Sequence, residues 1–174
     1  MNNLESEIYK LSFELSEILD ENEINKLLGI LSSDGVYAMW VYAMDKLDWK
    51  FSENIEEMKN MDLFRLIDMI SEIDKYVSRG MNYEDLLSEI ANLTNDIKCL
   101  KKEIENLKKE NRGKNSEVLN ENNNNLMEKE IERNKTLNKY FHELAQDLNK
   151  LLFMKELLEK VFIYARYHAR AKGK

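Results

Sequence analysis

The chain has 174 residues, the size of one domain or of one domain with an elongated appendage. With 43% hydrophobic and 34% charged residues, and no apolar run of about 20 residues, the composition excludes both a disordered chain and a membrane protein. The net charge of −7 hides a gradient, because residues 1–80 hold 8 basic against 17 acidic side chains whereas residues 81–174 hold 18 against 16.

Residues 1–80 are predicted to form a bundle of four or five short helices. Proline is absent and only five glycines occur in the whole chain, so few helix breaks are available and we predict an all-α fold. Apolar residues recur at steps of three and four in segments that begin at Leu4, Ile24 and Leu63, as they do on one face of a helix. Candidate N-caps are Ser33 or Asp34 for one of these helices and Asp62 for another.

The segment 36–44 reads Val-Tyr-Ala-Met-Trp-Val-Tyr-Ala-Met and has no polar face. A helix that is apolar all round is normally buried, so we expect this segment at the centre of the bundle. Its methionine and aromatic side chains are more typical of a core than of a cofactor site.

The clearest pattern begins at Asn82, which can cap a helix together with Asp85. Eight apolar residues then recur at strict three-four spacing: Tyr83, Leu86, Ile90, Leu93, Ile97, Leu100, Ile104 and Leu107. An ordinary amphipathic helix would drift off this period within about three heptads, so the pattern predicts a coiled-coil seam.

A second arm is predicted after a polar tip. Residues 111–125 contain seven asparagines and Gly113, which is typical of a loop or a frayed end. Helicity then resumes from about Leu126 to Ala171, with apolar seam residues interrupted at Lys155. Two long helices joined by such a loop favour an antiparallel hairpin. With the short helices before it, this hairpin gives two predicted domains. They are an N-terminal bundle over 1–80 and a coiled-coil-like hairpin over 81–174, whose base packs on the bundle.

We find no catalytic or metal-binding pattern. His142 has no second histidine four residues later, as the zinc-protease helix requires, and neither His142 nor His168 follows a glutamate at the di-iron spacing. Cys99 is the single cysteine and is more typical of a solvated thiol than of a nucleophile. We therefore expect a protein that is not an enzyme and that holds no cofactor or metal.

The C-terminal end is the candidate binding site, because from Lys160 onward there are five basic residues and no acidic one. Cations with aromatic neighbours suit phosphate and stacked-base contacts, whereas cations that favour the helix dipole at a frayed end are the plainer interpretation. The candidate nucleic-acid-binding residues are Lys160, Arg166, Tyr167, His168, Arg170, Lys172 and Lys174.

Two segments, LLGILSSDGVYAMWVY at residues 27–42 and LLEKVFIYARYHARA at residues 157–171, resemble the all-helical small-subunit family of type III CRISPR effector complexes. The first is similar to that family's early turn, where a glycine opens a buried apolar helix. The second is similar to its closing helix, with aromatic and basic residues. Residues 81–140 have no recognised counterpart.

The resemblance implies a non-catalytic subunit that packs with copies of itself and with the other protein subunits of a ribonucleoprotein complex. It would support the guide and target RNA through backbone contacts without base readout. The alternative is a coiled-coil structural or protein-interaction module with no nucleic-acid role. No membrane partner is expected, and residues 1–5 lack the features of a secretory signal, so the expected location is the cytoplasm.

Overall fold

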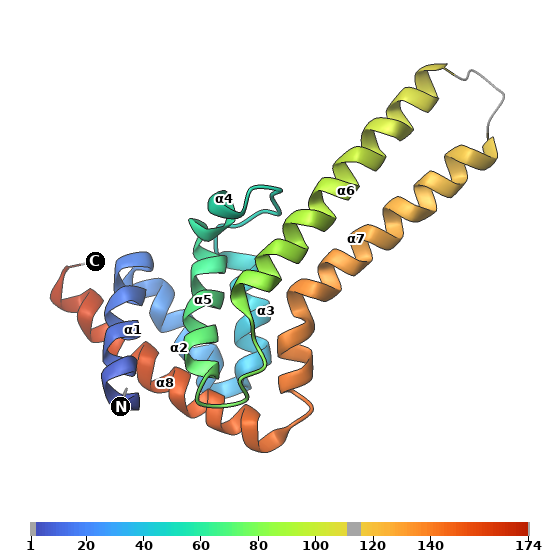
Figure 1. Cartoon of the computed structure of the whole chain (residues 1–174). Helices are drawn as coiled ribbons and strands as arrows, with labels where there is room; N and C mark the ends of the chain where they lie inside the picture. The colour runs from blue at the N-terminus through green and yellow to red at the C-terminus, as the bar shows by residue number, and fades with distance from the viewer. Residues whose placement is uncertain (1–2, 111–115, 174) are drawn as a thin grey trace. The chain divides into compact units, whose positions relative to one another are not determined.

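The computed structural model describes residues 3–110 and 116–173 (Figure 1). These residues form eight α-helices and no strand, so the predicted all-α fold is confirmed. The helices are α1 (Leu4–Ile18), α2 (Glu21–Asp34), α3 (Val36–Lys46), α4 (Ile55–Lys59), α5 (Asp62–Asp74), α6 (Tyr83–Glu110), α7 (Ser116–Leu144) and α8 (Leu148–Ala171).

The helices group into two compact units. The first, called here the bundle unit, comprises the described residues of Met1–Lys50, Lys59–Tyr83 and Tyr140–Lys174. The second, the hairpin unit, comprises those of Phe51–Met58 and Glu84–Lys139. This division differs from the predicted one at residue 80, because the last 35 positions of the chain belong with the N-terminal helices.

Helix α8 organises the bundle unit, where it packs against α1, α2, α3 and α5. Its buried side chains are Met154, Leu157, Leu158, Val161, Phe162, Ala165 and Ala169. Full burial of one such large apolar side chain contributes roughly 1.5–3 kcal/mol. The face of α8 that we predicted as part of a hairpin seam is therefore a principal part of the bundle core.

The helix predicted from Leu126 to Ala171 is in fact two helices, so that prediction is wrong. Helix α7 ends at Leu144 and α8 begins at Leu148. Asp147 caps α8, because its carboxylate accepts a hydrogen bond of 3.2 Å from the backbone N–H of Lys150, a contact that also lowers the pKa of Asp147. Apolar spacing of three and four continues across the break, so periodicity alone conceals it.

The first three helices follow the predicted segments but not the predicted caps. Ser33 and Asp34 do not cap α3, because α2 extends through both of them and their side chains hydrogen-bond each other at 3.0 Å. Gly35 occupies the N-cap position of α3 at φ +95°, a backbone conformation that glycine adopts without strain. Asp62 is the first residue of α5, so it is not the N-cap that we predicted.

Helix α3 is buried on one side only. Trp40 is fully buried and stacks on Phe141 with ring centroids 4.2 Å apart. Tyr37 and Val41, however, are 47% and 45% exposed. The expectation that 36–44 is buried all round is therefore wrong, because α2, α8 and Phe141 cover a single face.

A buried carboxylate ties three segments of the bundle unit together. Asp74, at the end of α5, is fully buried and accepts hydrogen bonds from the backbone N–H groups of Gly80 (2.7 Å) and Met81 (2.9 Å). The hydroxyl of Ser78 donates to it at 2.5 Å and the hydroxyl of Tyr140 at 2.7 Å. Asp74 thus fixes the turn after α5 and attaches the last residues of α7 to it.

The hairpin unit contains the predicted antiparallel arms, α6 and most of α7 (Figure 1). From the base of the arms outward, residues with higher numbers in α6 pair on the whole with lower numbers in α7, although the last two partners are 129 and 130. The pairs are Glu89 with Thr136 (3.0 Å), Thr94 with Arg133 (3.3 Å), Asp96 with Lys129 (3.6 Å) and Lys101 with Glu130 (3.0 Å). The long helical hairpin is therefore confirmed.

All eight predicted seam residues of α6 are buried or half-buried, and Ile90, Leu93, Ile97 and Ile104 are the most enclosed of them. The predicted loop at 111–125 is wrong over 116–125, which belongs to α7, whereas 111–115 lies outside the described residues. Leu119, Asn122 and Leu126 continue a three-four spacing there and are half-buried. Asparagine lowers helix propensity by only about 0.7 kcal/mol per residue, which pairing with α6 can offset.

Candidate nucleic-acid interface

The candidate residues lie along the second half of α8 and at Lys172, its C-cap, while Lys174 lies outside the described residues. Tyr167 is 53% exposed, and Arg170 is also exposed. Lys160, Arg166 and His168 are half-buried. The helix therefore brings these side chains to the surface of the bundle unit beside the core stripe of α8.

His168 is enclosed by two aromatic residues of α1 that sequence analysis missed. Its ring meets Tyr9 edge to face at 5.3 Å and Phe13 at 5.6 Å between centroids. Both remain well exposed, Tyr9 at 62% and Phe13 at 45%. Their spacing of four residues, away from the buried stripe of Ile8, Leu11 and Leu15, is the signal that could have found them.

Two of the candidate cations are paired with carboxylates. Arg170 donates from Nε and Nη2 to one oxygen of Glu21 at 2.8 and 2.6 Å. Lys172 pairs with Glu17, donates to the hydroxyl of Ser16 at 3.0 Å and lies 4.0 Å above the ring of Phe13. The tail has no acidic residue in its own sequence, but α1 and α2 supply acidic neighbours.

Lys160 and Arg166 differ in their surroundings. Lys160 has two weak ion pairs, each of 3.9 Å, with Glu5 and Glu156. Arg166 has no carboxylate partner among residues 3–110 and 116–173, and its buried Nε atom has no hydrogen-bond acceptor there. Its guanidinium carbon lies 5.2 Å from the ring centroid of Tyr167. Arg166 is thus the least compensated charge of the described candidate residues.

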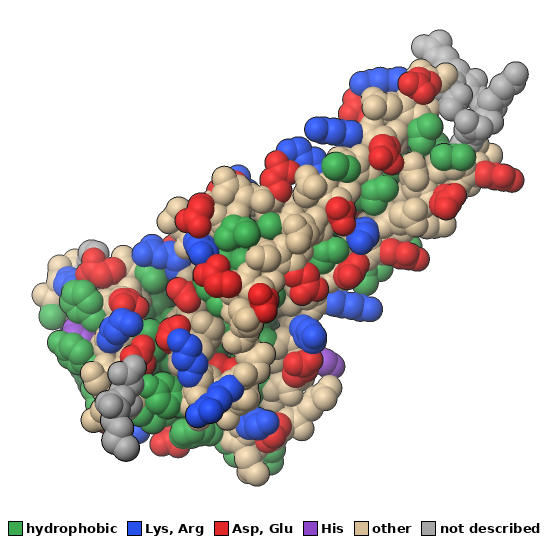
Figure 2. Space-filling model, in the orientation of Figure 1, with side chains coloured by type: hydrophobic (Ala, Val, Ile, Leu, Met, Phe, Trp, Pro, Cys, Tyr) green, Lys and Arg blue, Asp and Glu red, His purple; other side chains and the backbone are tan. Residues whose placement is uncertain are grey.

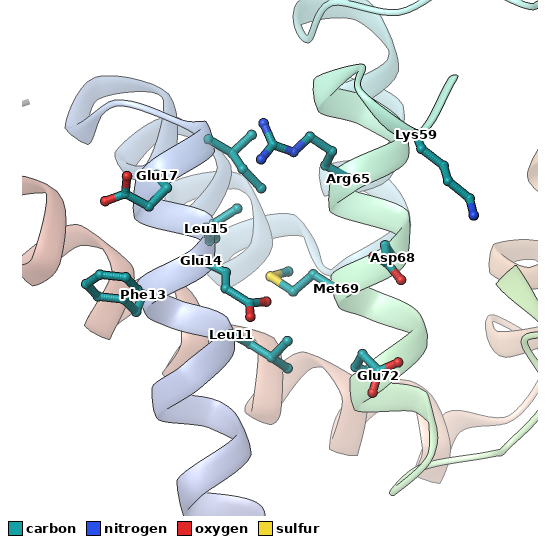
Figure 3. A pocket seen from close by; sticks show the side chains of 11 residues that line it. Leu11, Phe13, Glu14, Leu15, Glu17, Lys59, Arg65, Asp68, Met69 and Glu72 are labelled. Carbon is teal, nitrogen blue, oxygen red and sulfur yellow. The ribbon is translucent and has the colours of Figure 1, made fainter. Parts of the chain in front are cut away.

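A cavity of about 280 Å³ lies between α1 and α5 (Figure 3), and its lining includes Phe13 and Glu17, which also contact residues of the candidate interface. Leu11, Leu15 and Met69 provide its apolar part. Its charged lining comprises Glu14, Glu17, Asp68, Glu72, Lys59 and Arg65, so carboxylates outnumber cations. Its carboxylates would repel a polynucleotide.

The cations of the interface are held by contacts that a stronger ligand can replace. An exposed ion pair contributes only about 0–1 kcal/mol and is screened by salt. Exposed tyrosines next to cations suit stacking and phosphate contact. Acidic and basic side chains are interspersed on the face shown in Figure 2. We therefore expect the isolated chain to bind a polyanion only weakly.

Metal sites and membrane-spanning helices were sought in the described part of the chain. Residues 3–110 and 116–173 contain no cluster of three histidine, cysteine or acidic side chains that could hold a metal ion. None of the described helices combines the length and the apolar character needed to cross a membrane. Comparison of the chain with protein-family models, with curated proteins and with solved structures found no match.

Proposed function

We propose that this chain is a non-catalytic small subunit of a type III CRISPR effector complex, and that the second half of α8 contacts the phosphate backbone of the guide and target RNA. The observation that carries the proposal is the surface formed by Arg166, Tyr167 and His168 with Tyr9 and Phe13 of α1. Around one stretch of α8 it combines a charge that has no carboxylate partner among the described residues with the exposed rings of Tyr167 and, from α1, Tyr9 and Phe13. The resemblance of residues 27–42 and 157–171 to that family supports the same reading.

The mechanism follows from exchange of ion-pair partners. When a phosphate approaches, Arg170 and Lys172 leave Glu21 and Glu17 and bind phosphate oxygens, while Arg166 gains its first anionic partner. Such contacts give affinity and position without reading bases. The protein subunits of the complex would hold the RNA close enough for these weak contacts to form.

The second candidate function is a protein-interaction module without a nucleic-acid role. The observation that favours it is that Glu17 and Glu21 already neutralise two of the candidate cations. Exposed tyrosine and phenylalanine side chains such as Tyr9, Phe13 and Tyr167 are also typical of protein interfaces. Under this hypothesis the same surface binds a partner helix or a second copy of the chain.

Reciprocal charge variants separate the two functions. Arg170→Gln with Lys172→Gln removes two phosphate contacts, so RNA binding should weaken and the slope of log K against log salt should fall by about 0.7 to 0.9 per contact. Glu17→Gln with Glu21→Gln removes the internal competitors, so RNA binding should strengthen. The measurement is fluorescence anisotropy with two single-stranded RNAs of unrelated sequence, first on the chain and then on the complex copurified from the host.

The matched control is Lys135→Gln, which removes an exposed cation of the hairpin unit that has no partner among the described residues. It should leave binding unchanged. Equal affinities for wild type, both double variants and the control would remove the RNA role and favour the protein-interaction module. Opposite shifts of the two double variants would support backbone contact, and a protein-interaction surface alone does not produce them.

A further inference from the structure

Two grooves of opposite charge flank the seam of the hairpin unit. One, of about 500 Å³, is lined by the acidic residues Asp96, Glu103, Glu128 and Glu132 with Lys129 as the single cation. The other, of about 320 Å³, is called here the basic groove. Its charged lining residues are Lys98, Lys101, Lys102 and Arg133 against Glu105. A chain with a net charge of −7 therefore gathers four cations against one carboxylate in a single concave site.

Arg133 is held rigidly at one wall of this groove. Its guanidinium carbon lies 4.0 Å from the ring centroid of Phe51, and its Nη1 donates to the hydroxyl of Thr94 at 3.3 Å. Its buried Nε has no hydrogen-bond acceptor within residues 3–110 and 116–173. Burial lowers the pKa of Arg133, which means that the site disfavours a positive charge without a counter-ion.

The three lysines differ in how far they are neutralised. Lys98 pairs with Glu53 at 2.5 Å, and Lys101 pairs with Glu130 at 3.0 Å. Lys102 is exposed and has no ion-pair partner in the described part of the chain. Two of the four cations, Lys102 and Arg133, therefore have no ion pair in the described part of the chain, although Glu130 favours the charge of Arg133, and they line the same groove.

We propose that the basic groove binds phosphate groups, from either a small polyphosphate or a polynucleotide backbone. The planar fork of Arg133, oriented by Phe51 and Thr94, is suited to two oxygens of one phosphate. Lys102 and its neighbours add mobile point charges at the rim. The site stands apart from the proposed role of α8, because no residue of one site belongs to the other.

The test uses the full chain with two probes, tripolyphosphate by calorimetry and a fluorescent 20-nucleotide single-stranded RNA by anisotropy. Lys102→Gln with Arg133→Gln should weaken the binding of whichever probe occupies the groove by at least about tenfold, since each lost contact involves a charged hydrogen bond. Arg133→Lys keeps the charge but loses the fork, and should fall between this variant and wild type. Circular dichroism verifies that each variant keeps its helices.

Lys129→Gln is the matched control, because it removes one cation from the acidic groove of the same hairpin. It should leave the affinity of either probe unchanged. If Lys102→Gln with Arg133→Gln lowers the affinity for RNA alone, or for both probes, the ligand is a polynucleotide backbone. If it lowers the affinity for tripolyphosphate alone, the ligand is a small phosphorylated molecule. Arg170→Gln with Lys172→Gln should not alter tripolyphosphate binding, which keeps this test separate from that of α8.

Two results would overturn the proposal. One is that neither probe binds, or that the groove variant and the Lys129→Gln control bind equally well. The other is a salt-sensitive dimer that Lys102→Gln with Arg133→Gln dissociates while no phosphate probe binds. In that case the acidic groove of a second copy, rather than a phosphate, would be the occupant of the basic groove.

Discussion

The bundle unit and the hairpin unit stabilise their helices in different ways. In the bundle unit, apolar side chains from α1, α2, α5 and α8 enclose one another, and the buried carboxylate of Asp74 accepts several hydrogen bonds. In the hairpin unit, α6 supplies an apolar stripe while the facing side of α7 carries Lys129 and Arg133. The bundle unit therefore gains its stability from its core, whereas the hairpin unit places charges along a thinner seam.

The largest effect should come from the centre of the bundle unit. Phe162→Ala removes a fully buried ring of α8 and should lower the free energy of unfolding by about 3–5 kcal/mol, measured by denaturant titration. Leu152→Ala, at a position of α8 that is 54% exposed, is the control and should change stability little. Similar losses for both variants would show that α8 is not part of a packed core.

A matching substitution in the hairpin should cost less. Ile97→Ala leaves a cavity in the seam, and we expect a loss near 2 kcal/mol, the low end for such changes, because the α7 side can relax around it. Hydrogen exchange should rise in α6 and in residues 116–139 of α7 while the core of the bundle unit stays protected. Light scattering should give an unchanged mass, and a fall from dimer to monomer would show that the seam joins two chains.

The hydrogen bond between Tyr140 and Asp74 should contribute an intermediate amount. Tyr140→Phe should destabilise the bundle unit by about 1.5 kcal/mol at pH 7, since the bond is made to a charged group. Burial, and next the bond to Asp74, raise the pKa of Tyr140 well above its ordinary value. The stability from a neutral Tyr140 is therefore complete below about pH 10, where an unfolded tyrosine titrates, and declines as pH rises above that value.

The direction of this pH dependence is tested by comparing the melting temperatures of wild type and Tyr140→Phe at pH 7 to 11. The gap in melting temperature should stay constant up to about pH 10 and then close. Every other residue is the same in the two proteins, so its contribution cancels in the difference. A gap that widens above pH 10 would contradict the assignment.

The smallest effect concerns the segment that sequence analysis took for a loop. Asn123→Ala with Asn124→Ala replaces two exposed residues of α7 and should raise stability by up to about 0.5 kcal/mol per residue through helix propensity. The readouts are the melting temperature and the helical signal in circular dichroism. No gain in either would indicate that these positions are not helical in solution.

Contacts between residues close in sequence were easier to predict than contacts between distant segments. The seam of α6 was predictable, because periodic burial leaves a periodic pattern from Tyr83 to Leu107, although Leu87 and Ala91 are also buried and lie outside the predicted set. The break before Leu148 was not, since apolar spacing continues through it and the main partners of α8, helices α1 and α2, lie more than 100 residues earlier in the chain. Asp147, a good N-cap residue, was the available local signal.

The basic residues of the candidate interface could be named from the sequence, but their carboxylate partners could not. The sequence indicates that Arg170 and Lys172 share a basic tail, yet only the packing of α8 on α1 and α2 brings Glu17 and Glu21 to them. The same holds for Arg133, whose contacts with Phe51 and Thr94 join three separate segments. Long-range ion pairs leave no periodic trace in a sequence.

The position of α8 along the chain has a consequence for synthesis. Helices α1 and α2 emerge from the ribosome long before α8. The apolar faces that α8 covers therefore stay exposed until more than 100 further residues have been synthesised. At roughly 5–20 residues per second, this delay lasts about 5 to 25 seconds. During it the hairpin arms, whose contacts are closer in sequence, can already pair. The nascent bundle is therefore the part of the chain that would depend on chaperones.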